Sequence, residues 1–379
     1  MAEAGSGEQS DRSEEQAEGR REIRIPPFDF SWMYVTSQWG IRAQPSKHGL
    51  TLGGINVGIY GEIPDRYANK NLVARGAIES PGVLDQGFTV GEKQEVWAES
   101  TPDLYEEAIQ RRWIPATDVP WDTLVPLPAD VERAWCQIAT EISERSLVAL
   151  DAVATWVARI NYGYHEVKCF LATVMFDLMR HNEAFRKRAL ANGGGLGLQT
   201  PQWGHRNVVS AKNYTELTMM LFILQDAYLL TLCHYAESLA PSEAEVVLFR
   251  RTKQDLARHL AYGAEHLRYT LGKAVHRREE LQNYLRNGEI FWIRDMILNT
   301  PLPAAIAILA GGSREKAEEG MQTFEAFRRD FILRYLGYVE WAGILGWEDQ
   351  LTGLMAQWAG IEQERPDAGQ AAVPSSGAV

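Results

Sequence analysis

Two copies of one pentapeptide carry the side chains of this sequence that could do chemistry. Asp177–His181 reads Asp-Leu-Met-Arg-His, and Asp255–His259 reads Asp-Leu-Ala-Arg-His. Imidazole and carboxylate groups bind divalent iron, manganese and zinc, so each copy offers potential metal ligands. In a helix, the second position of each copy lies on the same face as the histidine three residues later, and in both copies it is leucine. The pattern therefore combines metal-binding groups with a hydrophobic residue where a further ligand could lie.

Both copies resemble the Asp-Glu-x-Arg-His signature of ferritin-like diiron-carboxylate proteins, with leucine in place of the glutamate. The flanking sequence, over about residues 103–270, is similar to ribonucleotide reductase small subunits and arylamine N-oxygenases of that superfamily. The resemblance implies four antiparallel helices, of which two supply a Glu-x-x-His pair and two supply a single glutamate. It places His181 and His259 at ligand positions, and Leu178 and Leu256 at the positions of the lost glutamates. The residues that match those surrounding the family's ligands are Asp177, Asp255, Arg180 and Arg258.

The same resemblance implies one further carboxylate on the helix that precedes each histidine helix. Glu144 fits this position best in the first half, with Glu141 as its neighbour. In the second half the corresponding window holds Gln225 and Asp226, and Asp226 is favoured because it keeps a negative charge. The resulting candidate ligand set is His181, His259, Glu144 and Asp226.

The two leucines argue against a diiron centre. Two divalent ions bring four positive charges, and with leucine at both bridging positions at most two ligand carboxylates remain. Burying uncompensated charge costs several kcal/mol per ion, so we expect no diiron cofactor. Asp177 and Asp255 could instead accept hydrogen bonds from His259 and His181, which would give a buried network with its own partners. A single iron or manganese ion on the two histidines and Glu144, resembling a two-histidine, one-carboxylate triad, stays open as the alternative.

The composition is that of a globular protein in a reducing compartment. The chain has 379 residues, of which 45% are hydrophobic and 23% charged, and a net charge of −12 that disfavours nonspecific nucleic-acid binding. Cys136, Cys169 and Cys233 are widely spaced in apolar helical stretches and are expected to be reduced core residues. The start of the sequence lacks the apolar stretch of a signal peptide, and two polar residues interrupt the longest apolar run. We therefore expect a cytoplasmic protein without a membrane span.

The elements that must position the two pentapeptides are helices. Apolar residues recur at helical spacing after residue 130, and glycines and prolines separate successive helical stretches. The sequence therefore predicts an all-α protein with a ferritin-like antiparallel four-helix bundle and additional flanking helices. The predicted helices cover about residues 130–160, 164–191, 214–239, 242–272, 276–298 and 314–343.

The remaining segments frame this domain. The ferritin-like domain is expected over residues 101–362, with its core over 130–272 and extra C-terminal helices over 276–362. An N-terminal arm of loops and short strands is expected over 23–100, because Leu50–Tyr60 is glycine-rich and β-branched. The segments expected to be disordered are an acidic tail over 1–22 and a C-terminal tail over 363–379.

Two functions from different classes follow. The first is a degenerate ferritin-like protein, a pseudoenzyme that has lost the diiron oxygenase site. It would serve as a scaffold, a carrier of a small apolar ligand, or a partner subunit in a homodimer or with a related ferritin-like subunit. The second is an oxidoreductase that uses the same pocket with an atypical mononuclear site or without metal. Only the analogy with the family indicates a dimer.

Overall fold

The computed structural model describes residues 27–36, 38–201 and 203–363. It divides the chain into two units, Met1–Trp39 and Gly40–Val379. The described part of the first unit contains one 3₁₀ turn, η1 (Ser31–Tyr34), and its side chains are exposed. The predicted N-terminal tail, and the predicted C-terminal tail except Gln363, lie outside the described residues.

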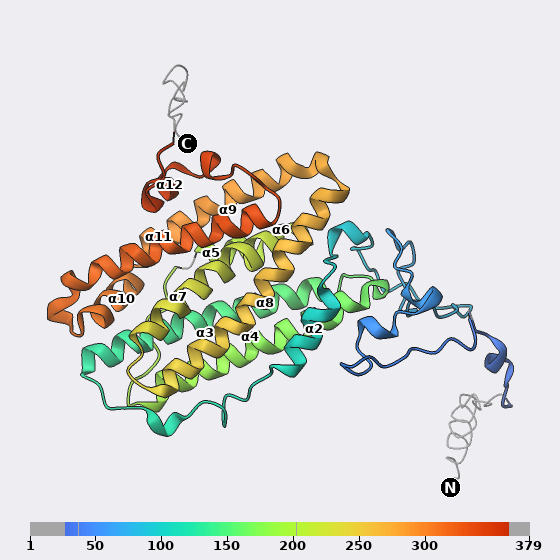
Figure 1. Ribbon diagram of the computed structural model, residues 1–379, viewed down its shortest axis with the longest axis horizontal. Helices are drawn as coiled ribbons and strands as arrows, with labels where there is room; N and C mark the ends of the chain where they lie inside the picture. The colour runs from blue at the N-terminus through green and yellow to red at the C-terminus, as the bar shows by residue number, and fades with distance from the viewer. Residues whose placement is uncertain (1–26, 37, 202, 364–379) are drawn as a thin grey trace, which may run out of the picture. The chain divides into compact units, whose positions relative to one another are not determined.

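The second unit is built from helices, which confirms the predicted all-α class (Figure 1). Four long helical segments form its core, and shorter helices flank them. Its α-helices and one π-helical segment, η7, are α2 (Thr101–Gln110), α3 (Ala129–Val157), α4 (His165–Ala191), α5 (Trp203–Val209), α6 (Tyr214–Thr218), η7 (Met219–Gln225), α7 (Asp226–Leu239), α8 (Glu243–Lys273), α9 (Arg278–Leu298), α10 (Pro301–Gly311), α11 (Ala317–Trp341) and α12 (Gly353–Ala359). Its 3₁₀ turns are η2 (Gly53–Ile55), η3 (Gly58–Gly61), η4 (Lys93–Glu95), η5 (Trp121–Thr123), η6 (Tyr162–Tyr164), η8 (Val275–Arg277), η9 (Arg314–Lys316) and η10 (Glu348–Gln350).

The core is an antiparallel four-helix bundle of α3, α4, the continuous segment α6–η7–α7, and α8. Both α3 and α8 run antiparallel to α4 and to α6–η7–α7. The contacts that fix these directions join Cys136 to Ala189, Asn182 to Ser143, Tyr228 to Glu141, Trp156 to Tyr214, Arg188 to Glu245, Phe170 to Tyr262 and Thr215 to His266. The long connection between α4 and α6 carries α5 and crosses the bundle from end to end. One long crossover of this kind is the arrangement of ferritin-like folds.

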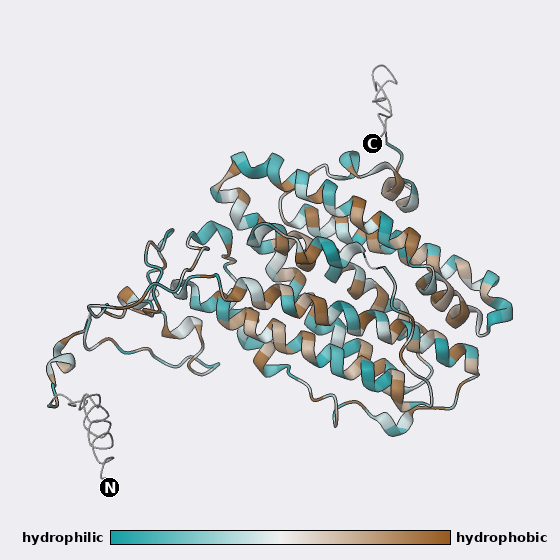
Figure 2. Ribbon diagram, turned by 180° about the vertical axis from the view of Figure 1, so that it is seen from behind, coloured by the Kyte–Doolittle hydropathy of each residue, from teal (hydrophilic) through white to brown (hydrophobic). Residues whose placement is uncertain are grey.

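The segment α6–η7–α7 is the apolar core helix of the bundle. Tyr214–Leu239 is long and apolar enough to cross a membrane, but 94% of its apolar window is buried inside the protein, as in the core helices of globular proteins. The helix pair 275–298 and 301–311 passes the same test only when its two parts, bent by 61°, are counted together. Hydrophobic and hydrophilic residues alternate around the long helices (Figure 2), which is the pattern of amphipathic helices packed on one core.

The predicted strand over Leu50–Tyr60 is wrong, because this segment forms the turns η2 and η3. Gly58 has a φ of 54°, in the left-handed region, which interrupts an extended backbone. The Leu52 N–H donates to Glu106 Oε1 of α2 at 2.7 Å instead of to a neighbouring strand. The described residues contain three isolated β-bridges and no sheet.

Helical periodicity misses α5, α10 and α12, which are short. Pro301 starts α10 at a position where its missing N–H costs nothing, and Gly312 ends the helix with a φ of 79°. This helix packs against α3 and α11, and α11 also packs against α7. The flanking helices therefore extend the hydrophobic core on one side of the bundle.

Gly320 brings α11 close to the backbone of α10. A Cβ at this position would lie 2.0 Å from Ala307 O. We therefore expect Gly320→Ala to lower the free energy of unfolding, measured by urea denaturation, by about 1–3 kcal/mol. Gly337→Ala on the same helix is the matched control, because no described atom lies within 4 Å of its added Cβ. It should leave stability unchanged or raise it by up to ~1 kcal/mol. Equal losses in the two variants would contradict the close packing.

Candidate functional site

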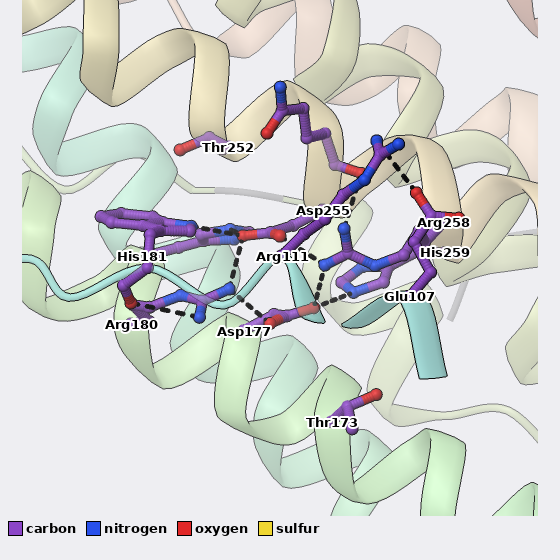
Figure 3. A network of polar contacts seen from close by, with 12 residues as sticks. Glu107, Arg111, Thr173, Asp177, Arg180, His181, Thr252, Asp255, Arg258 and His259 are labelled. Carbon is purple, nitrogen blue, oxygen red and sulfur yellow. Dashed lines mark hydrogen bonds and ion pairs between the residues drawn. The ribbon is translucent and has the colours of Figure 1, made fainter. Parts of the chain in front are cut away.

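The two pentapeptides face each other at the centre of the bundle, one on α4 and one on α8 (Figure 3). Their six polar side chains are all at most 3% exposed. The predicted hydrogen bonds across the bundle are present. His181 Nε2 lies 3.0 Å from Asp255 Oδ2, and His259 Nε2 lies 3.2 Å from Asp177 Oδ2. Each histidine therefore contacts the aspartate of the other copy.

The two arginines join the aspartates into one cluster. Arg180 Nη2 donates to Asp177 Oδ1 at 2.5 Å and to Asp255 Oδ2 at 2.8 Å. Arg258 Nη2 donates to Asp177 Oδ2 at 3.1 Å and also to Asp255 Oδ1. Each guanidinium thus contacts both carboxylates, and the two positive charges balance the two negative charges. Pairing every ion with an opposite charge offsets the cost of burying these groups, so removing one partner would be strongly destabilising.

Trp113 is the member of this cluster that sequence reasoning missed. It follows α2 in a proline-broken connector, and its indole Nε1 donates to Asp255 Oδ2 at 2.9 Å. Its backbone oxygen accepts from Arg180 Nη1 at 3.3 Å, and the Arg180 guanidinium lies 4.8 Å from its ring centroid. The sequence signal was a tryptophan in a proline-broken connector, which predicts an anchor onto the core but does not identify its partner.

The surroundings of Asp255 favour its charged form. Burial by itself raises the pKa of a carboxyl group. The hydrogen bond with His181 and the charges of Arg180 and Arg258 outweigh burial and hold the pKa of Asp255 well below its usual range. The carboxylate is therefore ionised at neutral pH and takes part in the balanced ion-pair cluster.

Leu178 and Leu256, the positions at which the sequence resemblance implied lost glutamates, are buried. Leu178 and Leu256 are 1% and 0% exposed and belong to the hydrophobic core. A buried leucine contributes about 1.5–3 kcal/mol of hydrophobic stabilisation and has no ligand atom. These positions are therefore ordinary core in this protein.

Asp226 is a buried carboxylate at the bundle centre, and neither of its oxygens has a hydrogen-bond partner among the described residues. It starts α7, directly after the π-helical turn η7, and is fully buried. Asp226 Oδ2 lies 3.4 Å from His259 Nδ1. Among the described residues, His259 Nδ1 and both carboxylate oxygens of Asp226 have no hydrogen-bond partner. Burial raises the pKa of Asp226. Burial opposes the charged form of His259, but its interactions with Asp177 and Asp226 outweigh this and raise its pKa to about 9.

The two residues that competed for the second-half carboxylate position point to different helices. Gln225 Nε2 lies 3.5 Å from Arg145 O of α3, whereas Asp226 faces His259 of α8. Asp226 is thus the residue that contacts a candidate ligand histidine, and Gln225 spans toward the opposite side of the bundle.

The carboxylates expected from α3 lie elsewhere. Glu141 accepts hydrogen bonds from Arg145 Nε at 2.6 Å, Tyr228 OH at 3.3 Å and Asn299 Nδ2 at 3.2 Å, so it belongs to a separate cluster. Glu144 is half-buried on α3. Across residues 27–363, apart from positions 37 and 202, no three or more His, Cys, Asp or Glu side chains are placed to hold one metal ion. The predicted set of Glu144, Asp226 and the two histidines is not assembled as a ligand group.

The donor set does not fit a diiron pair. The two carboxylates beside the histidines are already paired with guanidinium groups, and Leu178 and Leu256 provide no ligand atoms. Two further cations would enter a cluster without spare negative charge, which is unfavourable in a buried site. The ion pairs and the Trp113 hydrogen bond instead hold α4, α8 and the connector after α2 together.

Comparison with known proteins finds no matching family model and no matching curated protein. Solved structures of an R2-like ligand-binding oxidase are similar to this chain. One with a reconstituted metal cofactor after photoconversion is 15% identical, with a TM-score of 0.43 over 65% of this chain and 92% of that chain. Another with a reconstituted Mn/Fe cofactor is 14% identical, with a TM-score of 0.42 over the same shares. Likeness at this level does not transfer ligands or activity between chains.

Proposed function

We propose that this chain is a ferritin-like pseudoenzyme that has lost the diiron oxygenase site and acts in the cytoplasm as a scaffold or partner subunit. The observation that carries the proposal is the pair of guanidinium groups that bridge the two aspartates at the bundle centre. These four charges form a neutral set, and the two buried leucines beside them offer no ligand atoms. The former reaction centre would then be a structural core.

The exposed hydrophobic segment before residue 40 supports a role in binding another protein. Phe28 is 95% exposed and Trp39 is 86% exposed, and five further large hydrophobic residues between them are also exposed. Contiguous exposed aromatic residues are typical of protein–protein contacts. A second copy of this chain, as the family analogy implies, is the partner that we propose first, and a related ferritin-like subunit is the other candidate.

Metal analysis tests the loss of the diiron site. Protein produced in medium supplemented with iron and manganese should contain well below one equivalent of either metal, because the central charges are already balanced. The double variant Leu178→Glu/Leu256→Glu restores two carboxylates and should raise metal content if the surrounding geometry is retained. Leu147→Glu, an exposed position on α3, controls for added charge. Two equivalents of metal in the unsubstituted protein would overturn the proposal.

Light scattering of the full chain tests self-association. We expect the mass of a dimer, and we expect Trp32→Ser/Trp39→Ser to reduce it to the mass of one chain, because these rings are 67% and 86% exposed. The matched control is Trp341→Ser, an exposed tryptophan on α11, which should leave the mass unchanged. A single-chain mass for the unsubstituted protein would contradict the homodimer.

One observation favours a second function. Both Asp226 oxygens and His259 Nδ1 lack hydrogen bonds within the described residues, and they lie together in the core. A single iron or manganese ion bound there would give an oxidoreductase with an atypical mononuclear site. This alternative expects one equivalent of metal in the unsubstituted protein, lost in Asp226→Asn and in His259→Gln.

A further inference from the structure

A second buried polar cluster lies between α3, α7 and α9. Arg145 is fully buried, and its guanidinium contacts Glu141 Oε1 at 2.6 Å and also Asp295. Its Cζ lies 4.8 Å from the ring centroids of both Tyr228 and Trp292. The cation is thus enclosed by two carboxylates and two aromatic faces, away from the central pair of pentapeptides.

A small cavity borders this cluster. Its volume is about 10 Å³, and its polar lining residues are Tyr228, Trp292, Asp295 and Asn299. Leu302 and Phe324 are among the apolar residues that complete the wall. A cavity needs roughly 10–15 Å³ to hold one water molecule, and the water needs two to four polar partners. The size and the lining both meet these conditions.

Two polar atoms on the lining residues lack partners. Among the described residues, neither Asp295 Oδ1 nor Trp292 Nε1 makes a hydrogen bond. Both residues are at most 2% exposed, so bulk water does not supply the missing contacts. An unsatisfied buried donor or acceptor destabilises the folded state. An occupant of the cavity is therefore strongly favoured if it satisfies both atoms.

The two atoms together define the chemistry of the occupant. The indole N–H is a donor and requires an acceptor, whereas the carboxylate oxygen is an acceptor and requires a donor. A metal or ammonium ion would pair with the carboxylate but would leave the indole N–H facing a positive charge. An apolar group would satisfy neither. A molecule that both donates and accepts, and that has the size of one water, meets the whole requirement.

We infer that this cavity holds one permanently bound water molecule, which accepts from Trp292 Nε1 and donates to Asp295 Oδ1. The water supplies the two hydrogen bonds that Trp292 and Asp295 lack within the cluster that binds Glu141. Glu141 Oε1 accepts from Arg145 of α3 and Oε2 accepts from Asn299, which directly follows α9. The hydrated cluster accordingly keeps this carboxylate away from the two histidines.

A high-resolution crystal structure of the full chain tests the inference. We expect one density peak within hydrogen-bond distance of both Trp292 Nε1 and Asp295 Oδ1, with the peak height of a water oxygen. In solution, oxygen-17 magnetic relaxation should show one fewer long-lived water in Leu302→Phe, whose larger side chain takes up the cavity space, than in the unsubstituted protein. Leu333→Phe, at an exposed position on α11, should keep the full number. An empty cavity, a cation at the peak, or equal water counts in the two variants would overturn the inference.

Discussion

Asp255→Asn is expected to lower the free energy of unfolding by about 3–5 kcal/mol, as for other broken buried ion pairs. The Asp255 carboxylate accepts from Trp113, Arg180 and Arg258 and contacts His181. The amide keeps the shape but removes the charge, and its NH₂ group meets groups that already donate. Two guanidinium groups would then share one carboxylate in a core that excludes water.

Urea denaturation followed by circular dichroism measures this loss. Asp151→Asn is the matched control, because Asp151 is exposed on α3 and its substitution should change stability by no more than about 0.5 kcal/mol. A loss below about 1 kcal/mol for Asp255→Asn would contradict the claim that the two buried guanidinium groups need the Asp255 carboxylate as a partner.

Acid destabilisation through His266 is the second large expected effect. His266 is fully buried, its Nδ1–H donates to Trp97 O at 3.1 Å, and its Nε2 lies 3.2 Å from Thr215 Oγ1. Burial opposes the charged form and lowers the pKa of His266 to about 4 from 6.5. Below pH 6.5 the unfolded chain binds a proton that the folded protein excludes. The contribution of His266 is therefore complete above pH 6.5 and is lost as the pH falls toward 4, by about 3 kcal/mol.

The contribution of His266 can be isolated by measuring the free energy of unfolding from pH 7.5 to 4. The unsubstituted protein is compared with His266→Gln. His266→Gln should be less stable at neutral pH, because glutamine reproduces the hydrogen bonds to Trp97 and Thr215 imperfectly. Its free energy of unfolding should, however, fall less steeply as the pH is lowered. His234→Gln, at an exposed position on α7, should keep the slope of the unsubstituted protein. If the two variants have the same slope, protonation of His266 is not what destabilises the fold.

The repeated pentapeptide predicted much of the bundle because its information is local. The spacing of Asp, Arg and His on a helix places them on one face, and two such helices in antiparallel contact pair each histidine with the other aspartate. The periodicity of apolar residues similarly predicted the four long helices. These features depend on residues close in sequence, so a single chain contains enough information to predict them.

What the sequence could not predict depends on partners far along the chain. Glu141 accepts a hydrogen bond from Asn299, which follows α9 and is more than 150 residues away, and no local sequence pattern predicts that contact. Trp113 reaches Asp255 in the same long-range way. The strand predicted over Leu50–Tyr60 failed for a related reason, since β-propensity is realised only when a neighbouring strand is present.

The π-helical turn η7 decides which residue faces His259. A π-turn takes up one more residue than an α-turn, and one residue in an α-helix corresponds to a rotation of about 100°. Gln225 ends that turn and Asp226 begins the next α-helix. Removing one residue from η7 would rotate the helix that follows it by about 100° about its axis. Asp226 would then no longer face His259. The wider π-helical backbone of η7 therefore bears on which of two adjacent side chains meets the imidazole, and residue spacing in the sequence alone does not reveal it.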